Sequence, residues 1–315
     1  CQWSINTYAI AFDANEGLGA PESQTKIYDI TLSLSSTLPT RTGYTFTGWN
    51  TAANGSGNSY APGDTYADNA PITLYAQWSA LTYTITYDAN GGTGAPVEET
   101  KSYDFSISLS LSIPTQTGYT FTGWTTAANG SGTSYAPGNT YADNASITLY
   151  AQWSINTYAI AFDANEGLGA PESQTKIYDI TLSLSSTLPT RTGYTFTGWN
   201  TAANGSGNSY APGDTYADNA PITLYAQWSA LTYTITYDAN GGTGAPVEET
   251  KSYDFSISLS LSIPTQTGYT FTGWTTAANG SGTSYAPGNT YADNASITLY
   301  AQWSINTYAI AFDAE

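Results

Sequence analysis

Few side chains of this chain could carry out catalysis. The sequence contains no histidine and no methionine, and its single cysteine is the first residue, so the commonest general base and a thiol nucleophile are missing. Paired carboxylates remain, as in glycoside hydrolysis. The one kind of adjacent acidic pair is Glu98-Glu99, and the corresponding stretch of the preceding segment holds a single acid, Glu22. Because a catalytic pair should not be missing from every second copy of a repeat, we expect no enzymatic activity and no cofactor.

Calcium binding is a second candidate chemistry, at a recurring Asp-x-Asn-x-Gly pattern. Its first two occurrences contain Asp13 with Asn15 and Asp88 with Asn90. A calcium site needs six to eight oxygen ligands, usually with more than one carboxylate, and no bidentate glutamate follows at a useful spacing. A hairpin turn explains the same residues, since asparagine and glycine tolerate positive φ. We therefore expect a turn, with these four residues as the calcium candidates.

Sugar stacking is a third candidate chemistry, because exposed aromatic rings can bind carbohydrate. Tyr44 and Phe46 are two residues apart on one strand and share a face, whereas Trp49 comes three residues after Phe46. It therefore faces the other side of the sheet unless a bulge at Gly48 turns it inward. The alternative is a core position, where a tryptophan buries a large apolar area. The candidate ligand contacts are Trp49, Trp124, Trp199 and Trp274.

A covalent crosslink is a fourth candidate chemistry, because each segment carries one recurring lysine, as at Lys26 and Lys101. Some surface modules join lysine to asparagine through an isopeptide bond, which requires a buried lysine beside an acid. The polar Gln/Glu-Thr-Lys run favours the alternative, a solvated lysine. A mass lower by one ammonia per module would reveal the bond.

Composition limits the partners of this chain. It has 24 acidic and 6 basic residues, for a net charge of −18, and such a surface repels nucleic-acid phosphates and anionic lipid heads. A sequence rich in threonine, serine, asparagine, glycine and tyrosine with few lysines is typical of extracellular surface proteins. No stretch approaches the roughly 20 apolar residues of a membrane span, so we expect no membrane insertion in this segment.

Internal repetition dominates the organisation of the chain. Residues 2–151 recur unchanged as 152–301, and the spacing of Trp3, Trp78 and Trp153 reveals a 75-residue unit. Repeated modules supply length, spacing or many weak contacts instead of one active site. The expected modules are 4–78 (module A), 79–153 (module B), 154–228 (copy of A) and 229–303 (copy of B), between 1–3, the end of a preceding module, and 304–315, the first strand of a further one.

Modules A and B differ at 22 of 75 positions, and 18 of these differences fall in the first 38 residues of the module. Alternating two versions would limit strand exchange between neighbours, because the nearest true duplicate is then 150 residues away. Simple duplication of a two-module unit is the alternative explanation.

Within a module the apolar residues recur with period two, which indicates half-buried antiparallel strands. We expect strands at 8–13, 28–34, 44–51 and 72–78, with a loop around 60–66. The fold class is therefore mainly β, with at most a short helix per module. Only three residues join successive modules, so we expect a tandem array of four small modules that forms an elongated rod.

Three motifs in fixed order occur at residues 12–17, 39–49 and 72–78, reading Phe-Asp-Ala-Asn-x-Gly, then Pro-Thr-x-Thr-Gly-Tyr-Thr-Phe-Thr-Gly-Trp, then Ile-Thr-Leu-Tyr-Ala-Gln-Trp. They closely resemble the Listeria–Bacteroides repeat, which is related to the B repeat of internalin B. The resemblance implies a β-grasp-like module that occurs in tandem on bacterial surface proteins, with no catalytic signature. A β-grasp fold has a helix across its sheet, yet residues 30–38 alternate like a strand.

The two ends of the sequence depart from the repeat. Cys1 stands where the other copies have alanine, as a lipid-modified N-terminus or as an engineered residue; we favour the second because the sequence begins inside a repeat. Residues 304–315 repeat a first strand without the rest of its module, and an unpaired strand can add to a sheet edge. The candidate assembly residues are Tyr308, Ile310 and Phe312, and a window cut from a longer array is the alternative.

Together these features predict a structural repeat segment of a bacterial extracellular or cell-surface protein, acting as a stalk, adhesin shaft or filament-forming unit. Its partners would be neighbouring modules or further copies of itself. The alternative is an adhesive repeat that binds surface glycans or a host protein through exposed aromatic residues.

Overall fold

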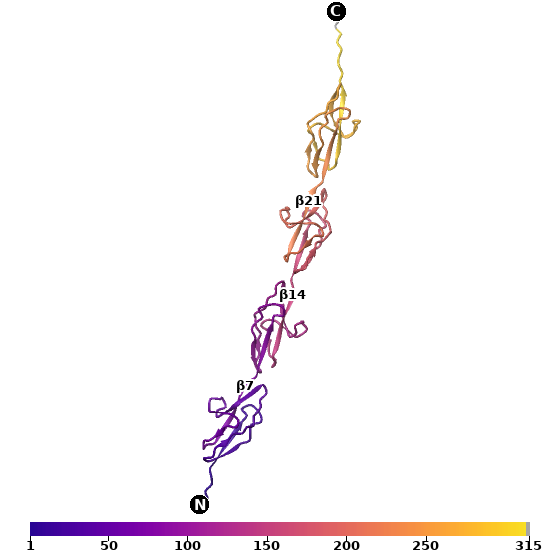
Figure 1. The fold of residues 1–315 in the computed structure, drawn as a ribbon. Helices are drawn as coiled ribbons and strands as arrows, with labels where there is room; N and C mark the ends of the chain where they lie inside the picture. The colour runs from indigo at the N-terminus through magenta and orange to yellow at the C-terminus, as the bar shows by residue number, and fades with distance from the viewer. Residues whose placement is uncertain (313–315) are drawn as a thin grey trace. The chain divides into compact units, whose positions relative to one another are not determined.

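Each module forms a five-stranded sheet accompanied by a two-stranded ribbon, and the computed structural model describes residues 1–312. Figure 1 labels β7, β14 and β21, the last strands of the first three modules. Module A contains β1 (Thr7–Asp13), β2 (Gln24–Ile27), β3 (Leu32–Ser33), β4 (Tyr44–Asn50), β5 (Ser59–Tyr60), β6 (Thr65–Tyr66) and β7 (Ile72–Ala80). Module B contains β8 (Thr82–Asp88), β9 (Glu99–Ser102), β10 (Ile107–Ser108), β11 (Tyr119–Thr125), β12 (Ser134–Tyr135), β13 (Thr140–Tyr141) and β14 (Ile147–Ile155).

The same strands recur in the second pair of modules. The copy of A contains β15 (Thr157–Asp163), β16 (Gln174–Ile177), β17 (Leu182–Ser183), β18 (Tyr194–Asn200), β19 (Ser209–Tyr210), β20 (Thr215–Tyr216) and β21 (Ile222–Ala230). The copy of B contains β22 (Thr232–Asp238), β23 (Glu249–Ser252), β24 (Ile257–Ser258), β25 (Tyr269–Thr275), β26 (Ser284–Tyr285), β27 (Thr290–Tyr291) and β28 (Ile297–Ile305). The chain divides into two units, Cys1–Asn156 and Thr157–Glu315, each with one A and one B module.

The mainly β class is confirmed, because every regular element in residues 1–312 is a strand. No helix crosses the sheet in that range, in agreement with the alternating pattern of residues 30–38. Consequently, none of the described segments offers a helix that could span a membrane.

The sheet of module A has the strand order β2-β1-β7-β4-β5, while β3 and β6 form the separate ribbon. The first strand β1 and the last strand β7 are paired in parallel, from Ile10 opposite Ile72 to Asp13 opposite Tyr75. The other pairs in the module are antiparallel. The chain therefore enters and leaves each module along two adjacent, parallel strands.

The core of a module is one compact aromatic and aliphatic cluster. In module A, Ile10, Trp49 and Leu74 are completely buried, and they come from the three central strands of the sheet. The Trp49 ring meets the edges of Phe12 and Phe46, with ring centroids 4.9 and 5.1 Å apart. Edge-to-face aromatic pairs add about 0.5–1.5 kcal/mol beyond the area that they bury. Each of the four modules has its own such cluster.

The expectation that Trp49 is an exposed ligand contact is wrong. The strand β4 shifts register against β7 between Phe46 and Gly48, where Gly48 adopts a φ of 146°. This bulge adds one residue and returns Trp49 to the face that Phe46 occupies. The indole is 0 % exposed, and the same holds for Trp124, Trp199 and Trp274.

The predicted strand at 28–34 is also wrong, because a turn interrupts it. Asp29 has a φ of 54°, so β2 ends at Ile27 and only the two-residue β3 follows. Leu34 still reaches the core, and its N–H donates to the carbonyl of Asp64 at 2.8 Å.

Two other boundaries differ from the expected ones. The predicted loop at 60–66 contains the end of the short strand β5 and the short strand β6. The last strand continues beyond Trp78 to Ala80, so the module boundary expected after Trp78 falls inside β7.

In module A, a glutamine fixes the segment that follows β3. The Gln24 Nε2 donates to the carbonyl of Ser33 at 3.1 Å, and its Oε1 accepts the N–H of Ser35 at 2.8 Å. Phe12 packs against the core of this module and needs no hydrogen-bond partner. One side chain therefore satisfies the exposed backbone groups of this segment.

Module B holds the equivalent segment with two different residues. The N–H of Ser110 donates to Tyr87 Oη at 3.0 Å, and that hydroxyl donates to Glu99 Oε2 at 2.6 Å. Burial raises the pKa of Tyr87, the Glu99 hydrogen bond raises it further, and the Ser110 N–H lowers it. The equivalent segment is therefore held by a different residue pair in each module type: Phe12 with Gln24 in module A, and Tyr87 with Glu99 in module B.

The buried indole should dominate the stability of its module. We expect Trp49→Ala to lower the free energy of unfolding of the first module by about 3–5 kcal/mol, because it empties the centre of the core. Circular dichroism during urea unfolding should show one of the modules unfolding at lower urea. Trp3→Ala is the control, since Trp3 is 94 % exposed. An unchanged unfolding curve for Trp49→Ala would contradict the assigned core.

Replacing only one member of the Tyr87–Glu99 pair by its module A counterpart should destabilise module B. Tyr87→Phe should destabilise module B by about 1–3 kcal/mol, because Glu99 and the Ser110 N–H lose their partner. Adding Glu99→Gln should recover most of this loss by restoring the pair found in module A. Urea unfolding of the single and double variants measures both effects. A double variant no more stable than Tyr87→Phe would show that the two positions are independent.

Candidate functional site

The joint between module A and module B is a candidate functional site, since it fixes how one module follows another. Only Leu81 separates β7 from β8. Its N–H donates to the carbonyl of Gly43 at 2.9 Å, and its carbonyl accepts the N–H of Tyr103 at 2.7 Å. One linker residue is therefore hydrogen-bonded to both modules. The same two bonds recur at Leu231, with Gly193 and Tyr253.

A tyrosine of module B packs directly on the backbone of module A at this joint. A Cβ placed on Gly43 would lie 2.3–2.4 Å from three atoms of the Tyr103 ring, and Gly43 has a φ of 79°. The Tyr103 ring also meets Tyr44 edge to face, at a centroid distance of 5.8 Å. Glycine is required at position 43 for two reasons, the positive φ and the close ring.

A shallow hollow of about 530 Å³ opens beside the joint, between the two modules. On one side Arg41 pairs with Glu16, Nη2 to Oε2 at 2.5 Å, and its guanidinium lies 3.9 Å from the centre of the Tyr44 ring. The Glu16 side chain is largely exposed, so the pair adds at most about 1 kcal/mol. Module B has Gln116 and Gly91 at these positions, so the ion pair beside the hollow is specific to the joint that follows module A.

The far end of module B shows related contacts. The N–H of Asn156 donates to the carbonyl of Gly118 at 2.9 Å, as Leu81 does to Gly43. The Asn156 side chain adds a bond that leucine cannot make, accepting from Thr120 Oγ1 at 2.7 Å. The linker residue is thus tied to the module before it in both module types.

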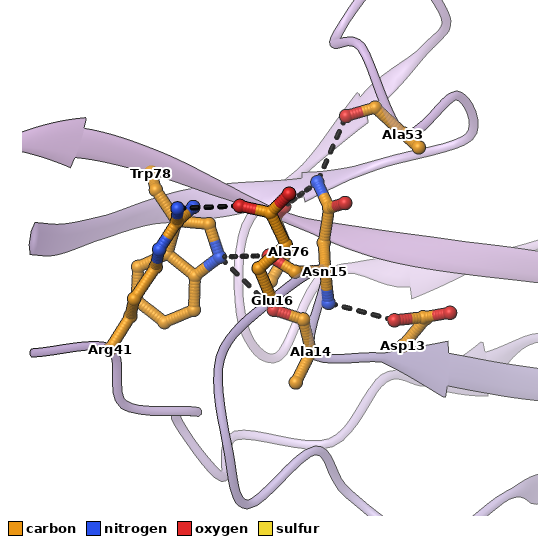
Figure 2. A network of polar contacts seen from close by, with 8 residues as sticks. All are labelled: Asp13, Ala14, Asn15, Glu16, Arg41, Ala53, Ala76 and Trp78. Carbon is orange, nitrogen blue, oxygen red and sulfur yellow. Dashed lines mark hydrogen bonds and ion pairs between the residues drawn. The ribbon is translucent and has the colours of Figure 1, made fainter.

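The calcium candidates form a hydrogen-bonded turn (Figure 2). Asp13 Oδ1 accepts the N–H of Asn15 at 2.7 Å, and Asn15 Nδ2 donates to the carbonyls of Ala53 and Ala76 at 2.9 and 2.8 Å. Asn15 has a φ of 47°, as the turn interpretation requires. The equivalent turn in module B joins Asp88 and Asn90 in the same way.

The last strand closes over this turn through its tryptophan. Trp78 Nε1 donates to the carbonyls of Ala14 and Asn15, both at 3.0 Å (Figure 2). Gly17 lies directly under the ring, where a Cβ would come within 2.4 Å of the indole. Asp13 Oδ1 and the carbonyls of Ala14 and Asn15 thus accept internal hydrogen bonds. No group of three or more potential metal-ligating side chains occurs within residues 1–312.

The expectation that the recurring lysine is solvated is wrong. Lys26 is 0 % exposed although it lies on the edge strand β2. Its side chain points inward, and Nζ donates to Asn69 Oδ1 and to the carbonyl of Ile27, both at 3.0 Å. Lys101 is buried in the same way and donates to Asn144 Oδ1 at 2.9 Å.

Sequence reasoning missed Asn69, which lies 43 residues from the lysine that it binds. One signal was available in the comparison of the two module types. Lys26, Asp29 and Asn69 are unchanged between modules A and B, although 18 of the 38 positions in the first half differ. It also missed Gly43 and Tyr103, whose contact crosses from one module to the next.

The candidate assembly residues lie beyond the last module. Tyr308, Ile310 and Phe312 are strongly exposed and belong to no strand, while residues 313–315 of the expected strand lie outside the described part of the chain. Ser304 and Ile305 belong to β28. Cys1 is exposed with a free thiol. Strand donation by residues 304–315 stays a prediction.

Comparison with known proteins connects these modules to a family. The Listeria-Bacteroides repeat domain matches the chain four times, at residues 8–77, 83–152, 158–227 and 233–302. Similar proteins include a putative Gly-rich membrane protein of Evansella cellulosilytica, with 33% identity over 331 positions, covering 99% of this chain and 35% of the relative. A putative membrane protein of the same organism is 31% identical, covering 97% of this chain and 45% of the relative.

Internalin H of Listeria monocytogenes is 42% identical over 117 residues, which cover 37% of this chain and 20% of the relative. The chain thus spans less than half the length of each of these relatives. The four matches follow the observed modules, each beginning within the first strand and ending within the last. The chain belongs to the Listeria-Bacteroides repeat domain family.

Proposed function

We propose that this chain is a non-enzymatic, load-bearing spacer of a bacterial surface protein, as a stalk, adhesin shaft or filament-forming unit. The parallel pairing of β1 with β7 carries the proposal. The chain enters at the start of β1 and leaves at the end of β7, which are opposite ends of the parallel pair. Tension along the chain therefore slides the two strands past each other and loads their hydrogen bonds together. In a peeling geometry the same bonds would break one after another.

The joint supports the same role. Leu81 is bonded on both sides, and Tyr103 packs against Gly43, so module B has little freedom to turn on module A. A joint with a single linker residue transmits force from one terminal strand to the next without slack. Modules A and B are then held at a defined spacing.

The relatives and the charge support a place at the cell surface. Two similar proteins are named as putative membrane proteins and a third as internalin H. The net charge of −18 keeps such repeats soluble and apart from anionic polymers. Self-association with further copies is part of the filament form of this proposal. The alternative is an adhesive repeat that contacts surface glycans or a host protein through exposed aromatic residues, and the burial of Trp49 removes its main candidate contact.

The mechanical role predicts that unfolding force depends on the pulling direction. In a chain with Cys1→Ala, handles at Thr7→Cys and Ser79→Cys shear β1 against β7, while handles at Thr7→Cys and Pro71→Cys peel them apart from one end. Single-molecule pulling should give a several-fold higher unfolding force in the shear geometry. These three handle positions are exposed, so the handles leave the core intact. Equal forces in both geometries would refute the load-bearing proposal.

The joint predicts a narrow range of distances between modules A and B. Spin labels at Asn54→Cys and Asn129→Cys, in a chain with Cys1→Ala, should give a narrow distance distribution that Tyr103→Ala broadens. Gly43→Ala should broaden it as well, because the new methyl group displaces the ring. Tyr28→Ala is the matched control, as Tyr28 is the equivalent tyrosine of module A itself. A distribution that keeps its width in both variants would show that the joint does not hold the modules.

A further inference from the structure

We infer that each module can close an intramolecular isopeptide bond between its buried lysine and the asparagine that precedes its last strand. In module A the bond joins Lys26 Nζ to the side-chain carbon of Asn69. This goes beyond the spacer role, which does not require the crosslink. The corresponding pairs, with their Nζ to Oδ1 distances, are Lys101 with Asn144 (2.9 Å), Lys176 with Asn219 (3.0 Å) and Lys251 with Asn294 (2.9 Å).

The nucleophile is buried and held by uncharged oxygens. Lys26 Nζ donates only to the carbonyl of Ile27 and to Asn69 Oδ1, both at 3.0 Å. The two ion pairs found in residues 1–312 both join arginine to glutamate, so no carboxylate pairs with this ammonium group. The lysine nitrogen is therefore kept beside one amide group and away from water.

The amide group of Asn69 is held on both sides by a single aspartate. Its Oδ1 accepts the backbone N–H of Asp29 at 3.0 Å, in addition to the bond from Lys26. Donors on this oxygen stabilise the negative charge that develops there when the carbon is attacked. On the other side, Asn69 Nδ2 donates to Asp29 Oδ1 at 2.6 Å. A carboxylate thus contacts the nitrogen that must leave.

An uncommon backbone conformation places Asp29 in this double role. Its φ of 54° turns both its N–H and its side chain toward Asn69, at the end of β2. Positive φ is uncommon outside glycine, although aspartate tolerates it, and such residues cluster at functional sites. The equivalent aspartates have the same conformation, with φ of 62° at Asp104, 56° at Asp179 and 59° at Asp254, and each donates its N–H to the equivalent asparagine. Within residues 1–312 the hydrogen bond from the asparagine amide nitrogen to the carboxylate is formed in module A, which therefore shows the complete arrangement.

A buried lysine can protect an edge strand from pairing with another sheet, but this role does not explain the contact between Asp29 and Asn69. An inward-pointing charge on an edge strand such as β2 discourages pairing with the edge of another sheet. That role needs Lys26 and an oxygen to bind it. It does not need a carboxylate on the amide nitrogen of Asn69, and the aspartate is retained in both module types.

The reaction balances without an oxidant or a further reactant. The Lys26 ammonium group passes one proton to Asn69 Oδ1, while Asn69 Nδ2 passes one to the Asp29 carboxylate. The free amine attacks the side-chain carbon of Asn69, and the Asp29 carboxyl group returns its proton to the amide nitrogen. Two protons remain, one on Oδ1 and one on the new carbon–nitrogen bond. One of them passes to the amide nitrogen, the bond from that nitrogen to the carbon breaks, and the other converts the released ammonia to ammonium. One ammonium group is consumed and one is released, so the charge is unchanged.

The bond would brace the strands that carry load. In the sheet order β1 lies between β2 and β7, and the crosslink joins the third residue of β2 to the loop that precedes β7. It therefore brackets β1 on both sides with a covalent link. Sliding of β1 against β7 would then have to pull against this link as well as against the hydrogen bonds.

The test is the intact mass of the freshly purified, denatured full-length chain. We expect a mass below that of the sequence by one ammonia for each closed module, and a protease-derived peptide pair that links Lys26 to Asn69. A mass equal to that of the sequence would overturn the proposal. Deamidation changes the mass in the opposite direction, so it cannot imitate the result.

Two variants separate this bond from other losses of ammonia. Lys26→Arg removes the nucleophile and should reduce the deficit by one ammonia, whereas cyclisation of Asn69 on its own backbone would persist. Asp29→Asn removes the carboxylate but tolerates the positive φ, and it should also reduce the deficit by one in a folded chain. A full deficit in Lys26→Arg would overturn the proposal. The pulling experiment on Lys26→Arg tests the spacer role separately, since shear should still exceed peeling there.

Discussion

The parallel pairing of β1 with β7 is the constraint on which the rest of the structure depends. It brings the two ends of a module together as neighbouring strands while leaving the entry and the exit at opposite ends of the pair. The last strand can then run on as the first strand of the next module, with Leu81 alone between β7 and β8. An antiparallel pair would return the chain to the side from which it came, and a one-residue joint could not form.

A 75-residue module without a disulfide must hold this pairing through packing, and at this size it buries only roughly 60% of its unfolded surface. The indole of Trp49 supplies the largest buried side chain and packs against Phe12 of β1 and Phe46 of its own strand, β4. The indole of Trp78 adds hydrogen bonds that anchor the turn after β1 to the last strand. In this module two tryptophans therefore provide stabilisation of the kind that a disulfide provides in other small extracellular modules.

Period-two alternation predicted the mainly β class because half-buried strands expose one face and bury the other. The same parity argument failed at Trp49, because a bulge changes the face of every later residue, and Gly48 alone does not say whether a bulge occurs. It failed at residues 28–34 because the positive φ of Asp29 ends a strand that alternation would continue. The burial of Lys26 could not be predicted locally, since its partner Asn69 is brought near only by the complete sheet.

The differences between modules A and B are coupled through the fold. The hydroxyl that distinguishes Tyr87 from Phe12 needs an acceptor, which Glu99 provides in place of Gln24, and it also accepts the N–H of Ser110. If neighbouring modules exchanged their first strands, Phe12 would lie beside Glu99 and leave that carboxylate and the Ser110 N–H without a partner. An unpaired buried group costs about 1–3 kcal/mol, so the correct pairing is favoured over the exchanged one. Alternating two self-consistent modules therefore disfavours strand exchange in an array whose second halves are nearly identical.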